Sequence, residues 1–210
     1  MKKVILSIAT IALLTSCGGE EKKEVSNIDS TKKETQQIKT SVSGTFNVVA
    51  DSTSNLTWTG SAIGKSHYGT VDYKGSLTVK EGQIIGGNLV FDMATIDTQD
   101  QEGKMKDYLD GHLKNHEFFH VDSFPTSKLV IKGFDGENLK GDLTIKDVTK
   151  SISFPATVTI TESSIQGSAE FSIDRTEYGI THNAKGFMEV AKDKLINNEV
   201  SFKVKINAFK

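Results

Sequence analysis

Three histidines spaced four residues apart form the most obvious chemical pattern in this 210-residue sequence: His112, His116 and His120. On one continuous helix, side chains at this spacing lie on the same face, where three imidazoles can bind zinc. The segment 117–119, Glu-Phe-Phe, does not suit a solvent-facing helix that continues through all three histidines. We therefore expect no metal site and no cofactor.

Two further side chains could contact the polar end of a ligand. Arg175 is the only arginine beside twenty-four lysines, which suggests that this position needs a planar guanidinium with several donors. The alternative is a structural role, in which the Arg175 guanidinium connects a strand to a turn through hydrogen bonds to carboxylates. His67 is expected in a loop between strands, where it either faces a binding site or is solvated.

Motifs that would indicate catalysis are missing from the sequence. It contains no nucleophile elbow, no phosphate-binding loop, no paired-cysteine site and no His-Glu-x-x-His motif. The formal net charge of −2 lacks the basic excess that is typical of nucleic-acid-binding proteins. We expect a protein that is not an enzyme and does not bind nucleic acid.

The N-terminus has the features of an export signal. Lys2 and Lys3 precede the apolar segment 4–14, whose eleven residues are too few to span a bilayer core of about 30 Å as a helix. The next residues, Leu14-Thr15-Ser16-Cys17, resemble the bacterial lipobox, in which the cysteine becomes the lipidated first residue after signal removal. We expect a signal peptide over 1–16 and a lipidated Cys17 that attaches the chain to the membrane.

The residues after the cysteine point to a location and to a linker. In well-studied enteric bacteria an aspartate next to the lipidated cysteine favours the inner membrane, whereas Gly18 and Gly19 stand here. We expect the cell envelope, at the outer membrane facing the periplasm, with surface exposure as the alternative. Residues 17–42 contain no aromatic side chain and predict a disordered linker, while all sixteen aromatic residues lie from Phe46 onward, in a domain over 43–210.

Within this domain apolar residues alternate with polar ones, as in half-buried antiparallel strands. Leu56 and Trp58 begin one such series, and Val200 to Ile206 form the last. One segment, 104–114, instead carries apolar residues at helical spacing. About eight long strands and one short helix predict an all-β fold, an extended up-and-down barrel like a lipocalin, because closure removes exposed edges. Such a barrel holds either packed side chains or one small ligand.

Several motifs in order along the domain resemble the YceI-like family. They are His112-Leu113-Lys114, Glu117-Phe118-Phe119, Phe124-Pro125-Thr126, Gly141-Asp142-Leu143-Thr144-Ile145-Lys146, Val148-Thr149-Lys150 and the segment 171–180, FSIDRTEYGI. The resemblance covers about residues 45–208. Three positions depart from the family pattern: Asp147 replaces a usual glycine, His116 replaces a common proline, and Asn198 stands near a place where family members often have an acidic residue.

The resemblance implies a lipocalin-shaped barrel that binds, and carries or sequesters, a long isoprenoid or other long-chain lipid. Arg175 and His67 are then possible head-group contacts. The alternative is a structural envelope lipoprotein whose barrel is filled by its own side chains, since the same residues could form either wall or core. The expected ligand-binding residues are Trp58, Leu77, Leu89, Phe91, Leu143, Ile145, Phe154, Phe171 and Phe202.

Overall fold

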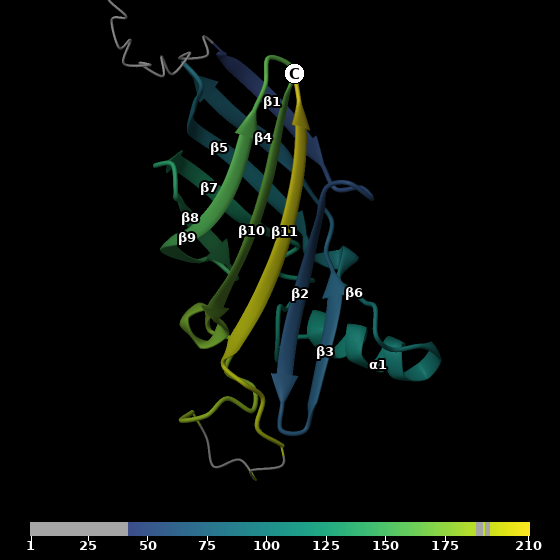
Figure 1. Cartoon of the computed structure of the whole chain (residues 1–210). Helices are drawn as coiled ribbons and strands as arrows, with labels where there is room; N and C mark the ends of the chain where they lie inside the picture. The colour runs from purple at the N-terminus through teal and green to yellow at the C-terminus, as the bar shows by residue number, and fades with distance from the viewer. Residues whose placement is uncertain (1–41, 188–190, 192–193) are drawn as a thin grey trace, which may run out of the picture. The chain divides into compact units, whose positions relative to one another are not determined.

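Eleven strands of one sheet, every neighbouring pair antiparallel, make up most of the computed structural model, which describes residues 42–187, 191 and 194–210 (Figure 1). The predicted signal peptide, Cys17 and nearly all of the predicted linker lie outside the described residues. The elements are β1 (Gly44–Val49), β2 (Asn55–Ala62), β3 (Lys65–Thr70), β4 (Tyr73–Lys80), β5 (Gln83–Asp92), η1 (Met93–Thr95), β6 (Asp97–Thr98), α1 (Gly103–Lys114), β7 (Thr126–Phe134), β8 (Asn138–Ile145), β9 (Val148–Ile160), β10 (Ser164–Asp174), η2 (Arg175–Tyr178) and β11 (Glu199–Phe209).

Eight of these strands form a closed ring. The order is β1-β4-β5-β7-β8-β9-β10-β11, and a pairing of Asn47 with Phe209 joins β11 back to β1. The predicted all-β barrel of about eight strands with one short helix is therefore confirmed. The remaining three strands, β2, β3 and β6, extend the sheet from β11 at one end of the ring.

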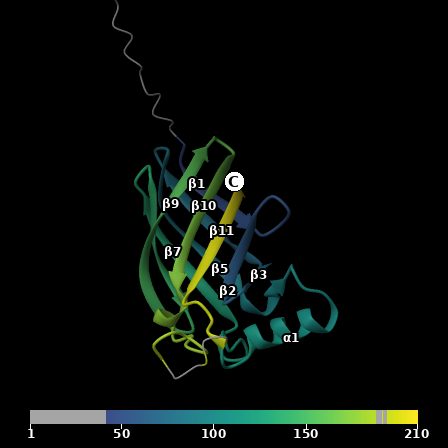
Figure 2. The ribbon, with the colours of Figure 1, turned by 60° about the horizontal axis from the view of Figure 1, so that its bottom comes forward.

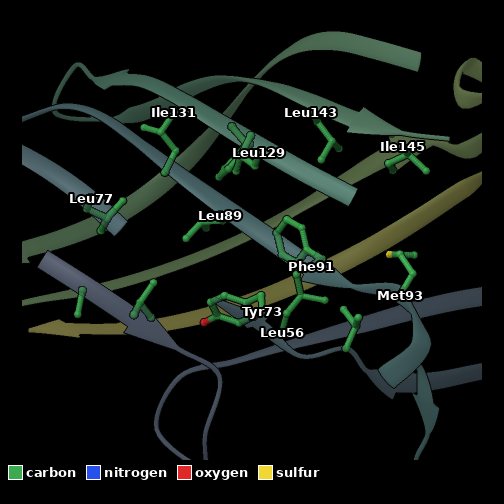
Figure 3. Packing of buried hydrophobic residues seen from close by; sticks show 14 of the residues in the cluster. Leu56, Tyr73, Leu77, Leu89, Phe91, Met93, Leu129, Ile131, Leu143 and Ile145 are labelled. Carbon is green, nitrogen blue, oxygen red and sulfur yellow. The ribbon is translucent and has the colours of Figure 1, made fainter. Parts of the chain in front are cut away.

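Period-two alternation determines which side chains enter the barrel. In β7, for example, Leu129 and Ile131 are buried while Val130 between them is 46% exposed. Figure 3 shows apolar side chains from different strands, among them Leu77, Leu89 and Ile131, pointing toward one another inside the ring. Removal of this apolar surface from water is the main favourable term in folding.

The edge of β11 is shared by two strands in succession. Residues 201–205 of β11 pair with β2, whereas Phe209 pairs with β1. On this edge β11 therefore changes its partner between residues 205 and 209. Ser54, fully buried at this break, accepts a hydrogen bond from Asn207 N (2.7 Å) and donates one to Asn207 O (3.1 Å). Tyr73 reaches across from β4 and donates its hydroxyl proton to Lys205 O (2.8 Å). These side chains supply the hydrogen bonds that the interrupted strand cannot.

On the other side of the ring, β9 changes its partner near Pro155. Residues 148–155 pair with β8, whereas 156–160 pair with residues 165–169 of β10. Pro155 has no N–H to donate and therefore fits a position where the strand changes its partner. Before Ala156 in β9 and after Ala169 in β10, these two strands are no longer paired. Their backbones are therefore hydrogen-bonded at one end of the barrel and separated at the other.

The two ends of the barrel are therefore different. At the packed end, Gly82 N donates to Val42 O (2.8 Å) and Lys210 N donates to Ser163 O (3.2 Å), so both limits of the described domain lie there. The open end carries α1, η2 and the segment that joins η2 to β11. Figures 1 and 2 show α1 beside this end, away from the C-terminus.

The helix α1 begins one residue before the predicted segment and ends at Lys114, as expected. Asp110 attaches it to β6, because this carboxylate accepts hydrogen bonds from Thr98 N (2.9 Å) and Thr98 Oγ1 (2.6 Å). None of its residues is buried, and Met105 and Tyr108 are 64% and 72% exposed. Among the described residues, no helix has the length and apolar character needed to cross a membrane.

Candidate ligand-binding cavity

A cavity of about 620 Å³ occupies the open end of the barrel. This volume lies within the range of roughly 300–1,000 Å³ that is usual for small-molecule sites. Its walls include residues of β2, β3, β5, β7, β8, β9, β10, β11 and α1, and most of the lining side chains are apolar. The cavity can therefore exclude water from an apolar molecule that enters from this end.

The structure places most of the predicted ligand-binding residues on cavity walls. Leu77 and Phe154 lie deeper, beside a second cavity of about 70 Å³. Leu89 lines neither cavity and packs in the core with 3% exposure. The contact of any of these residues with a ligand stays a prediction. Those on the wall of the larger cavity are Trp58, Phe91, Leu143, Ile145, Phe171 and Phe202.

Trp58 is held on the wall by its neighbours in the β2–β3 hairpin. Its indole Nε1 donates to Thr70 O (3.2 Å), and Gly69 stands opposite it in the register. A Cβ at Gly69 would lie 2.5 Å from the indole ring, so only glycine permits this close approach. The hairpin therefore fixes the largest apolar side chain of the wall in one position.

Four side chains separate the larger cavity from the smaller one. Leu56, Phe91, Leu129 and Phe171 each line both. Phe171 also stacks on Phe154, with ring centroids 4.0 Å apart and an interplanar angle of 9°. This stack connects β9 and β10 where the two strands are no longer hydrogen-bonded. At this point the wall is closed by contact between side chains and not by backbone hydrogen bonds.

Arg175 has a structural role. The side chain is 3% exposed and donates three hydrogen bonds to main-chain carbonyls, from Nε to Asn197 O (3.0 Å), from one terminal nitrogen to Ile180 O (2.7 Å) and from the other to Ile196 O (3.1 Å). It thus ties η2 to the segment before β11, as the structural alternative proposed, but through carbonyls rather than carboxylates. Burial lowers the pKa of the guanidinium from its ordinary value. Although Arg175 lines the cavity, these three hydrogen bonds are directed to the backbone.

His67 lies in β3, so its expected placement in a loop is wrong. The loop prediction failed because β2 and β3 form a tight hairpin whose turn comes earlier, at residues 63–64. The imidazole Nδ1 lies 2.9 Å from Asp100 Oδ2, and the side chain lines the larger cavity. Hydrogen bonds from His67 and Tyr68 keep the pKa of Asp100 below its ordinary value, although burial acts in the opposite direction.

The three histidines at four-residue spacing do not converge. The helix ends at Lys114, His116 is exposed, and His120 adopts a left-handed backbone conformation (φ 49°) and contacts Ser123. Only His112 reaches the cavity, because it belongs to the last turn of α1. The sequence pattern therefore does not form the zinc site that an unbroken helix would have allowed.

A different cluster forms at the rim of the cavity from His112, Glu117 and His182. His182 Nδ1 lies 3.2 Å from one oxygen of the Glu117 carboxylate, and His112 Nδ1 lies 3.6 Å from the other. The two imidazole centroids are 5.0 Å apart. Burial, followed by the neighbouring His182, lowers the pKa of His112, whereas Glu117 raises it. Sequence reasoning missed this cluster because no local pattern connects residue 182 with residue 112.

Solved structures share this architecture at low sequence identity. BcnA of Burkholderia cenocepacia is 16% identical with a TM-score of 0.60, over 74% of this chain and 96% of that one. A polyisoprenoid binding domain from Saccharophagus degradans is 13% identical with a TM-score of 0.60, over 78% and 97%. The YCEI protein of Campylobacter jejuni is 18% identical with a TM-score of 0.51, over 66% and 81%. At these identities the likeness establishes the fold.

Comparison with curated proteins found no match. The model of the YceI-like domain, in contrast, matches residues 22–208, which is most of the chain. This match agrees with the family motifs, which lie in α1, between α1 and β7, along β8 and β9, and in β10 and η2, and with the closed eight-strand ring. The chain belongs to the YceI-like family.

Proposed function

We propose that this protein binds a long apolar lipid, an isoprenoid, in the cavity at the open end of its barrel, and carries or sequesters it in the bacterial cell envelope. The observation that carries the proposal is the cavity of about 620 Å³ whose walls are largely apolar. The mechanism is passive binding, in line with a sequence that has no catalytic motif. We therefore infer a binding protein rather than an enzyme.

Burial alone can supply the affinity. Each CH₂ group transferred from water to an apolar site is worth about 0.8 kcal/mol before ordering costs. A chain of ten such groups would therefore gain about 8 kcal/mol, which offsets much of the cost of association. Lipid binding by burial needs no specific polar contact. This agrees with an Arg175 side chain whose donors already bind main-chain carbonyls.

Two features support the isoprenoid class. The solved domain from Saccharophagus degradans, which has this fold, is described as binding polyisoprenoids. The deeper cavity of about 70 Å³ also lies beyond a partition of four apolar side chains, so a long chain could extend inward if these side chains rotated. Polar groups at the rim, His67 among them, would then remain near the head group.

The envelope location rests on the lipobox-like residues that end at Cys17. Val42 lies at the packed end, where its carbonyl accepts from Gly82 N, so a lipid-anchored linker that precedes Val42 would enter the domain opposite the cavity mouth. An extended chain of 25 residues reaches at most about 80–90 Å, whereas the eleven residues of β11 span about 37 Å. A linker over 18–42 is thus long enough to let the open end face the bilayer, which would give the lipid a short path into the barrel.

Native mass spectrometry of the full chain tests this proposal. The chain is extracted in a detergent of known mass, and collisional activation removes the micelle. We expect one extra lipid per chain beyond the covalent anchor, with a fragmentation pattern typical of isoprenoids. A parent chain that always appears without additional mass would contradict the proposal.

A matched pair of valine variants serves as the control. Val200→Trp places an indole in the cavity from β11, whereas Val130→Trp adds the same group to the outer face of β7, where the valine is 46% exposed. We expect the first variant to lose most of the bound lipid and the second to keep it. Equal lipid content in both would show that the lipid binds elsewhere.

A further inference from the structure

We propose that His112, Glu117 and His182 form a binding site for a divalent transition metal, with zinc as the best fit, at the rim of the cavity. Their potential ligand atoms all lie within 4.8 Å of one another. Two imidazoles and one carboxylate are a donor set that zinc uses in proteins. The site would be separate from the apolar walls and from the unconnected histidines His116 and His120.

Two distances within the cluster are close to the spacing between ligand atoms around a zinc ion. Ligand atoms about 2.0–2.2 Å from zinc in a tetrahedral arrangement lie about 3.3–3.6 Å from one another. His182 Nδ1 and His112 Nδ1 are 3.2 and 3.6 Å from the two oxygens of Glu117. One ring nitrogen of each histidine and one Glu117 oxygen lie within 4.8 Å of one another, and a bound zinc would bring these three atoms to the tetrahedral spacing.

Three separate segments hold these donors in place. His112 is in the last turn of α1, Glu117 follows the helix, and His182 lies in the segment after η2. Asn115 connects the first two, because its Oδ1 accepts from Glu117 N (2.8 Å) and its Nδ2 lies 3.3 Å from His112 Nδ1. An amide nitrogen can only donate, so His112 Nδ1 is unprotonated in this contact, and zinc would take the lone pair in place of the Asn115 amide.

The surroundings of the cluster also suit a metal. Phe118 packs against both imidazoles, with ring centroids 4.8 Å from His112 and 5.5 Å from His182. The far nitrogen of His182, Nε2, lies 3.0 Å from Asn183 Nδ2. A metal on Nδ1 leaves a proton on Nε2, so the Asn183 amide would turn its oxygen toward this proton and act as the outer partner. Since all three donors line the cavity, a fourth coordination position would face the lumen.

A cluster held only by hydrogen bonds is the competing explanation. A carboxylate between two imidazoles is satisfied if the rings carry protons toward it, and no ion is then required. The two explanations make different predictions, because zinc needs all three side chains and a hydrogen-bonded cluster gives no stoichiometric metal binding.

Calorimetric titration of the full chain, without a histidine tag, with zinc chloride tests the proposal. We expect one zinc per chain, and Co²⁺ in its place should give the visible absorption of a tetrahedral nitrogen and oxygen site. Changes to outer partners of zinc ligands weaken binding about 10–100-fold, so removal of a direct ligand should cost about 100-fold or more. The test variants are His182→Ala, His112→Ala and Glu117→Gln, the last of which preserves the shape of the side chain.

His116→Ala is the matched control, because His116 is exposed, four residues from His112, and outside the cluster. It should bind zinc like the parent, as should Val200→Trp, so that metal binding is measured independently of lipid binding. The proposal is overturned if the parent binds no zinc, or if Glu117→Gln and His116→Ala bind it equally while both remain folded by circular dichroism.

Discussion

The packed end and the open end of the barrel are built from the same strands but differ in what closes the wall. At the packed end, β11 pairs with β1, and residues 156–160 of β9 pair with residues 165–169 of β10. At the open end β9 and β10 separate, and β2, β3 and β6 extend the sheet from β11. Side chains fill the first end, whereas the second contains the larger cavity.

This difference shows that the interior volume follows from strand pairing more than from side-chain size. Phe46 and Phe202 are both inward phenylalanines, yet Phe46 is fully buried at the packed end and Phe202 lines the cavity. The predicted alternatives, a side-chain-filled barrel and a hollow one, therefore describe opposite ends of the same molecule. A ligand site can form at the open end while the packed end supplies stability.

The largest expected effect comes from exchanging these two phenylalanines separately for alanine. Phe46→Ala should reduce the free energy of unfolding by about 3–5 kcal/mol, because it leaves a new cavity in a packed region. Phe202→Ala should cost only about 1–2 kcal/mol, since it enlarges a space that already exists. Urea unfolding measures both losses. Equal losses would show that the two ends are packed alike.

Removal of the partition should give the next largest effect. Phe171→Ala takes away a ring that separates the two cavities and stacks on Phe154. We expect a loss of about 3 kcal/mol in unfolding free energy and a shift toward longer bound chains in native mass spectra. Bound lipids of unchanged length in a folded variant would indicate that the deeper cavity takes no part in binding.

A smaller effect, on the rate of lipid exchange, is expected from changes in the exposed apolar face of α1. Tyr108 and Leu109 on this helix line the cavity, so we expect α1 to control one opening of the barrel. The double variant Tyr108→Asp, Leu109→Asp should accelerate lipid exchange between the protein and vesicles several-fold while the melting temperature changes little. An exchange rate equal to that of the parent would rule out a gating role.

The smallest expected effect is a pH-dependent loosening of α1. Burial would raise the pKa of Asp110, but hydrogen bonds from Thr98 and the nearby Lys106 outweigh it and keep the pKa below its usual value. A carboxyl with a lowered folded-state pKa stabilises the fold above its unfolded pKa of about 3.9, and this contribution is lost as the pH falls through the folded value.

Hydrogen exchange, corrected for the intrinsic pH dependence, should therefore show α1 amides losing protection below about pH 4 while β7 amides keep theirs. In Asp110→Asn the protection of α1 should already be reduced at pH 7 and should respond little to acid. Unchanged protection of α1 in the parent down to pH 3 would contradict this role of Asp110.

Much of the fold could be predicted from local patterns, because alternation and helical spacing are properties of neighbouring residues. The series through Leu129 and Ile131 and the helix that ends at Lys114 are examples. The strand pairing could not be predicted, since it depends on where β9 leaves β10. For this reason the sequence identified wall residues such as Trp58 but also included Leu89, which lines no cavity.

The polar part of the site was harder to predict for the same reason. Arg175 was singled out by its rarity, yet its carbonyl partners come from two segments whose proximity only the fold determines. The cluster of His112, Glu117 and His182 joins residues up to seventy positions apart. No local spacing could reveal it, whereas the regular spacing of His112, His116 and His120 pointed to a site that the end of α1 prevents.

Quenching of Trp58 fluorescence tests the central claim most directly, because Trp58 is the only tryptophan in the chain and lies on the cavity wall. Bromine quenches an indole only at short range, so a brominated isoprenoid reports on occupancy of the cavity. We predict saturable quenching at one molecule per chain, reversed by an unbrominated competitor. Full fluorescence at concentrations where the lipid demonstrably binds the protein would contradict the account.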